Sequence, residues 1–369
     1  MKLRTIGIFR LLLFCLFLFY KTGVNAQLLD TMRYRRASLV TMMIEHPMNL
    51  FNAELVEAFK STPMPERFND HNLGVRVVRF ATQEYYDQTN YIEQFIQKVK
   101  LGNHVVAKWF NWNKADGSFN INLVRKRGLY DATFTDYAIV KHTMRGKAIL
   151  EDAGENLIQQ TYLVMNDICF KGCYGIHESD NNVVGTKKEF DVDVTSYLFQ
   201  LKWSADSMNT FIHYYWPSTP NFVEKSFPYS FNFRAKVTTK YKDSSSSISQ
   251  DSLIKRAVAR CLDLNIAKLQ KAYPKFRIKV RLLSTNPLMA DVGLKENITE
   301  KSVFEVLECV VDDNGVESFE RVGLIRPRKG KICDNRYMSD TEQFLTVFDK
   351  IKGANFYPGM LIREIDDNH

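Results

Sequence analysis

The alternation of apolar and polar residues is clearest between residues 229 and 240. Tyr229, Phe231, Phe233 and Ala235 occupy every second position, with polar residues between most of them. A period of two places these side chains on one face of an extended chain, which predicts a half-buried antiparallel strand. Similar runs predict further strands at 73–80, 119–124, 161–165, 197–203 and 276–282.

Helical spacing dominates other parts of the chain. Ile254, Val258, Cys261 and Leu269 recur at intervals of three, four or eight residues. They predict a long helix over 251–272, and the serine-rich stretch before it reads as a linker with a helix cap. The same reasoning predicts shorter helices at 36–44, 52–59, 87–99, 105–112 and 204–215, and two helices between 134 and 156.

The last hundred residues predict a small β-rich module. Two apolar runs, 302–311 and 317–325, flank the sequence Asp-Asp-Asn-Gly that ends at Gly315. Asn-Gly supplies the left-handed conformations of a tight hairpin, so these runs are expected to pair. A helix at 340–351 and a terminal strand at 360–365 complete this prediction.

These elements predict an α+β protein of two parts. A length of 369 residues suggests about two domains, because single cores stop growing near 250–300 residues. We expect a mixed α/β domain over 27–241 with a polar loop at 171–189, then a linker and helix over 242–275. The β-rich, barrel-like module follows over 276–369.

The first 26 residues have the pattern of a secretory signal peptide. Three basic residues precede an apolar run over 11–20, and small residues surround Ala26. We expect cleavage after Ala26 and an exported protein, periplasmic or extracellular, without a transmembrane anchor after cleavage. Four positive charges of the net +8 lie in this segment, which leaves +4 for the mature chain. That mild, scattered charge and the export signal argue against a nucleic-acid partner.

Two resemblances add to these patterns. The stretch Met289-Ala-Asp-Val-Gly-Leu294, with 302–306, resembles small β-barrel modules of bacterial envelope proteins, for example those of flagellar ring-associated proteins. Trp109-Phe-Asn, Arg127-Gly-Leu-Tyr130, Asp152-Ala-Gly154 and Asp334-Asn-Arg-Tyr337 together are similar to a family of exported bacterial proteins of unassigned function. The resemblance implies a location in the cell envelope and brings no catalytic motif.

Five cysteines remain after cleavage, and an oxidising compartment permits disulfides. Cys169 and Cys173 are possible partners across a tight loop, and Cys309 and Cys333 flank the predicted hairpin. Cys169, Cys173 and His177 also have a metal-like spacing, but no fourth ligand is apparent. We expect no metal and no cofactor.

No motif of a known catalytic class occurs in the chain, so we expect no catalytic residues. Cysteine–histidine pairs involving His142, His177 or His213 cannot be placed by sequence, and acid pairs such as Asp191 and Asp193 are too common to discriminate.

An aromatic stretch is the best candidate for binding. Tyr214, Tyr215, Trp216 and Phe222 are proposed to contact a partner, with burial in the core as the plainer alternative. The sequence therefore favours a non-enzymatic binding or scaffolding protein for a macromolecular envelope partner, either protein or glycan. The alternative is a hydrolase acting on an envelope or extracellular polymer, which a polar cleft with perturbed pKa values would favour.

Overall fold

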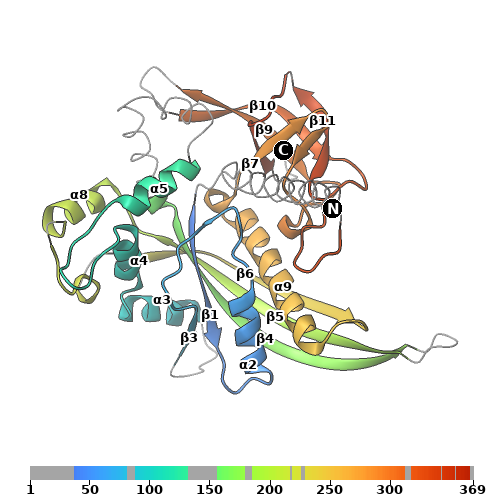
Figure 1. The fold of residues 1–369 in the computed structure, drawn as a ribbon, viewed down its shortest axis with the longest axis horizontal. Coiled ribbons are helices and arrows are strands. Elements are labelled where there is room, and N and C mark those ends of the chain that lie inside the picture. The colour runs from blue at the N-terminus through green and yellow to red at the C-terminus, as the bar shows by residue number, and fades with distance from the viewer. Residues whose placement is uncertain are drawn as a thin grey trace, which may run out of the picture.

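The computed structural model describes residues 37–80, 88–131, 156–178, 185–216, 218–225, 229–311, 317–341, 343–353 and 355–365. The expected signal peptide lies outside these ranges, and so does the segment 134–156 in which two helices are expected, except for its last residue. The described chain forms an α+β fold with two units, a sheet covered by helices and a closed β-barrel (Figure 1). The predicted fold class is confirmed.

The first unit is a mixed sheet in the order β2-β1-β4-β5-β6, with β3 also paired to β1. Strand β1 runs parallel to β2, β3 and β4, whereas β4, β5 and β6 are successively antiparallel. The strands are β1 (Ser38–Glu45), β2 (Asn69–Asp70), β3 (Val77–Arg79), β4 (Thr161–Glu178), β5 (Gly185–Leu201) and β6 (Phe231–Ser245).

Helices cover both faces of this sheet (Figure 1). One face carries α3 (Gln88–Lys98), α4 (Leu101–Trp109), α5 (Asn122–Asp131) and α8 (Ala205–Tyr214), which enclose an aromatic-rich core. The other face carries α2 (Asn52–Ser61) and α9 (Gln250–Ala272), which pack on a second core. Ser249 caps α9 by accepting a hydrogen bond from the Ser252 N–H at 3.2 Å, which agrees with the predicted cap.

The second unit is a closed barrel in the order β10-β11-β8-β7-β12-β9. Its strands are β7 (Val280–Thr285), β8 (Leu288–Ala290), β9 (Val303–Val311), β10 (Glu317–Pro327), β11 (Thr346–Gly353) and β12 (Leu361–Ile365). Val311 pairs with Glu317 in an antiparallel ladder, as the hairpin prediction requires, although Asn314 and Gly315 lie outside the described residues. Because the barrel is closed, every strand is paired along both edges, and the interior of the barrel is apolar.

Helix α9 joins the two units. Asn265 on this helix is fully buried and donates hydrogen bonds to the Val194 carbonyl and to Ser196 of β5. After α9, the 3₁₀ turn η2 (Pro274–Phe276) places Phe276 in a stack on Phe68, with ring centroids 4.9 Å apart. The 3₁₀ turn η3 (Leu294–Glu296) of the barrel lies against α9. The helix is therefore buried on two sides.

Some predicted elements are wrong. Residues 38–45 form strand β1 rather than a helix, because a central parallel strand is apolar on both faces and loses the alternation that marks a strand. The stretch 119–124 leads into α5 and is not a strand. The predicted helix over 340–351 is replaced by β11, which buries Phe348 and leaves Phe344 80% exposed. Most of the expected loop at 171–189 belongs to the long β4–β5 hairpin.

Within the described residues, no helix combines the length and the apolar character that crossing a bilayer requires.

Candidate functional site

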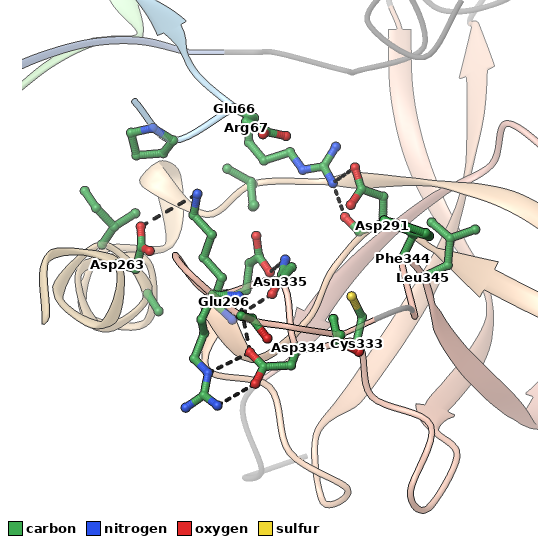
Figure 2. A pocket seen from close by; sticks show the side chains of 18 of the residues that line it. Glu66, Arg67, Asp263, Asp291, Glu296, Cys333, Asp334, Asn335, Phe344 and Leu345 are labelled. Carbon is green, nitrogen blue, oxygen red and sulfur yellow. Dashed lines mark hydrogen bonds and ion pairs between the residues drawn. The ribbon is translucent and has the colours of Figure 1, made fainter. Parts of the chain in front are cut away.

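A cleft of about 440 Å³ lies where α9, residues 65–68 and the barrel meet. Figure 2 shows Asp263 on α9, Arg67 before β2, and Asp291 and Asp334 of the barrel around the same space. No single unit forms this cleft, because its walls come from segments far apart in the sequence. Sites between units commonly hold ligands.

Each basic residue of the cleft wall has an acidic partner. Arg67 contacts the Asp291 carboxylate at 2.8 Å and also donates to the Asp291 carbonyl. Arg336 holds Asp334 through two hydrogen bonds of 2.7 and 2.6 Å, and this guanidinium lowers the pKa of Asp334. The Lys295 ammonium lies 3.8 Å from Asp263. The positive charges of the wall are therefore already neutralised.

Asp263 is the most perturbed acid of the cleft. Its side chain is buried on α9, and burial raises its pKa from 3.8 to about 7. Lys295 lowers this pKa, while the negative charges of Glu296 and Glu66 raise it. A carboxyl with such a pKa exchanges its proton near neutral pH, which marks candidate functional sites.

Glu296 presents a second, fixed carboxylate. Its Oε2 accepts hydrogen bonds from the Gly293 N–H at 2.8 Å and from Asn335 Nδ2 at 2.9 Å. Asn335 Oδ1 in turn accepts from the Lys295 N–H at 2.9 Å. Among the described residues Glu296 has these hydrogen bonds and no ion pair. Its charge is oriented by neutral donors and stays available to a ligand.

Gly293 allows two segments of the cleft wall to pack closely together. A Cβ at this position would lie 2.3 Å from the Cys333 carbonyl oxygen, which is inside van der Waals contact. The absent side chain lets the Leu294 N–H bond this carbonyl at 2.9 Å. The segments that carry Glu296 and Asn335 are thereby held together.

A second hollow, of about 350 Å³, shares Arg67 with the cleft and is lined by several basic residues and no acid. Its three arginines are engaged internally. Arg363 pairs with Glu305 and donates to it at 2.7 Å, and Arg277 donates to the Gln270 and Glu364 carbonyls at 3.3 Å. Arg67 is paired with Asp291. This hollow is therefore a weaker candidate site than the cleft.

The chain matches no model of a known protein family and no curated protein.

The aromatic residues predicted to bind a partner do not lie at this cleft. Tyr214 is 66% exposed on α8, whereas Tyr215 and Trp216 are partly buried and pack against the core. Phe222 is completely buried, with its ring centroid 5.2 Å from that of Phe119. Phe222 therefore stabilises the core and cannot present its ring to a partner. The role proposed for the others stays a prediction.

The two disulfides suggested by sequence do not form. Cys169 and Cys333 are free thiols. Cys169 and Cys173 lie four positions apart on β4, about 13 Å along an extended strand, which is too far for a disulfide. The Cys333 thiol donates to the Gln343 carbonyl, and burial raises its pKa to about 11. The side chains of Cys173 and His177 lie outside the described residues.

Sequence reasoning missed Asp263, Glu296 and Arg67. The sequence does contain one signal for Asp263, because small residues, Ala259 and Ala267, lie four positions before and after it. In the structure both alanines are buried. An acid between two such residues indicates a second packed face on the helix. The cleft residues Asp291 and Asp334–Arg336 fall within the segments that carried the resemblance to envelope proteins.

Proposed function

We propose that the protein is an exported binding protein that takes a cationic side chain of a partner protein into the cleft between α9 and the barrel. The observation that carries the proposal is an excess of negative charge in the cleft lining. Among the described residues, Lys295 is the one lining cation beside the two acids Asp263 and Glu296, because Arg67 and Arg336 pair with Asp291 and Asp334. A lysine or arginine of a partner would supply the missing positive charge.

The surroundings of the two acids support a protein ligand. Phe344 is 80% exposed and lines the cleft, as do the apolar side chains of Ile266 and Ile278. Apolar and aromatic surface beside paired charges suits the methylene stem of lysine or the guanidinium plane of arginine. The expected signal peptide places this interaction in the bacterial periplasm or at the cell surface.

Binding is expected to be stronger at alkaline pH. Asp263 keeps its proton below its pKa of about 7 and attracts a cation only when ionised. A bound ammonium group favours the ionised form, so binding releases a proton and affinity rises between about pH 6 and pH 8.

Isothermal titration calorimetry with hexalysine tests the proposal. Hexaglutamate, which carries the opposite charge, is the control ligand. The whole chain is basic, so general electrostatics disfavour hexalysine and any binding points to a local site. We expect hexalysine to bind at about pH 8, and Asp263→Asn and Glu296→Gln to weaken it by about tenfold or more. Glu189→Gln, on the distant β4–β5 hairpin, is the matched control. Equal affinity in all four proteins would refute the proposal.

One observation favours a second function. A carboxylic acid with a pKa near 7, beside another carboxylate, suits general acid–base catalysis in a hydrolase of an envelope or extracellular polymer. Assays of the purified protein on glycan and peptide polymers separate the two functions. Turnover that is lost in Asp263→Asn would establish the hydrolase, whereas hexalysine binding without turnover would support the binding protein.

A further inference from the structure

A second group of polar side chains lies at the edge of the sheet where β1 ends. His46 directly follows β1, while Asp167 and Cys169 lie on β4, its parallel neighbour. The register pairs Ile44 with Asp167, so the next residues on the same faces, His46 and Cys169, come level with each other. The carboxyl ends of parallel strands are common ligand sites in open sheets.

Asp167 and Cys169 continue one face of β4 beyond its apolar core, and His46 lies beside them at the end of β1. Leu163 and Met165 precede Asp167 at alternate positions and are completely buried beneath the α3–α4 layer. Ile168, between Asp167 and Cys169, instead packs on the opposite face with α9. The cluster is therefore separate from the cleft, which lies on the α9 side.

The three donor atoms lie close enough to share one ion. His46 Nε2 is 2.6 Å from Asp167 Oδ1, and Cys169 Sγ is 3.8 Å from the same oxygen. All three donor atoms lie within 4.8 Å of one another. In a tetrahedral zinc site with ordinary bond lengths, donor atoms stand about 3.4–3.6 Å apart. The Cys169 sulfur and the Asp167 oxygen are near that spacing. The His46 nitrogen needs to move away from the Asp167 oxygen by less than about 1 Å.

We propose that His46, Asp167 and Cys169 bind a zinc ion whose fourth coordination position is open to water or a ligand. One imidazole, one carboxylate and one sulfur ligand suit zinc and disfavour calcium and magnesium, which take oxygen ligands. The His46 and Asp167 side chains are only 14% and 8% exposed, so the ion would be held in a largely enclosed site. The metal-like spacing in the sequence also includes Cys169 but combines it with Cys173 and His177.

No fourth histidine, cysteine or acid within the described residues joins the cluster. Asp193 stands opposite Cys169 in the β4–β5 ladder, but Lys171 engages it at 3.9 Å. Three protein ligands with an open position are typical of catalytic zinc sites, whereas structural sites usually have four. The proposal is thus independent of the cation-binding cleft and predicts a second site in the protein.

Cobalt titration of the full chain tests the site. The protein is purified under reducing conditions, stripped with a chelator and titrated with Co²⁺, whose thiolate complexes absorb in the near ultraviolet. We expect one equivalent of Co²⁺ to bind with this absorption and to be displaced by Zn²⁺. Cys169→Ser should abolish the absorption, and His46→Ala and Asp167→Asn should weaken Zn²⁺ binding by about tenfold or more.

Cys261→Ser is the matched control, because Cys261 is a buried free thiol on α9, away from the cluster. It should leave the cobalt spectrum unchanged. Absence of the absorption in the wild-type protein, or its survival in Cys169→Ser, would overturn the proposal. Circular dichroism checks folding, and because serine differs from cysteine by one atom, the Cys169→Ser comparison decides even if His46→Ala fails to fold.

Discussion

The carboxyl group of Asp263 is buried and has little contact with water. Burial raises its pKa from 3.8 to about 7, and the Lys295 ammonium at 3.8 Å does not reverse that effect. The folded protein therefore keeps a proton that the unfolded chain has lost between about pH 4 and pH 7. Folding takes up a proton in this range, so the contribution of Asp263 to the free energy of unfolding falls as the pH rises.

Asp263→Asn should remove this dependence. At about pH 4 the variant and the wild type are expected to be similarly stable, because the carboxyl is protonated in the folded protein. At about pH 8 the variant should be more stable by as much as about 4 kcal/mol, since roughly three pKa units are relieved. Urea unfolding at both pH values measures the difference. Glu320→Gln, at an exposed position of β10, is the control, and a difference that does not grow with pH would contradict the prediction.

The packing of α9 on the sheet depends on a buried polar network as well as on apolar contacts. Asn265 accepts a hydrogen bond from the Thr239 hydroxyl at 2.5 Å and donates to Ser196 at 2.8 Å. Ser196 then donates to Asn166 of β4 at 2.7 Å. The network crosses β4, β5 and β6, and its fixed geometry sets how the helix lies on the strands.

Asn265→Ala should therefore destabilise the protein by about 2–4 kcal/mol, because it leaves buried partners unsatisfied and creates a small cavity. Ser249→Ala on the same helix removes one exposed cap and should cost about 1 kcal/mol. Chemical denaturation of both variants compares the two effects. A cost for Asn265→Ala no larger than that of the cap variant would show that the network contributes little.

Elements whose pattern is local were predictable, and those set by distant contacts were not. Strand β6, helix α9 and the β9–β10 hairpin follow from alternation, helical spacing and Asn-Gly. Strand β1 was mistaken for a helix because burial on both faces removes its period. The cleft escaped prediction for a related reason. Arg67 and Asp291 are 224 positions apart, and only the docking of the barrel brings them together.

Several polar contacts join the two units. Arg67 is 10% exposed at its side chain and links the segment before β2 to Asp291 of the barrel. Arg260 of α9 donates to the carbonyls of Tyr337 at 3.0 Å and Met338 at 3.2 Å, and Lys271 pairs with Glu364 at 3.3 Å. Loss of a buried charge pair is costly, because the remaining partner keeps its desolvation penalty. Arg67 should therefore couple the stability of the barrel to that of the sheet.

Arg67→Ala is expected to separate the unfolding of the two units. All four tryptophans lie in the sheet unit, so their fluorescence reports that unit alone, whereas far-ultraviolet circular dichroism reports both. In the wild type the two probes should give coincident transitions, which is the mark of one cooperative unit. In Arg67→Ala the circular dichroism transition should begin before the fluorescence transition, because the barrel unfolds first. Arg79→Ala, which removes an exposed pair with Glu45, should keep the transitions together, and a coincident transition in Arg67→Ala would show that the barrel does not depend on this contact.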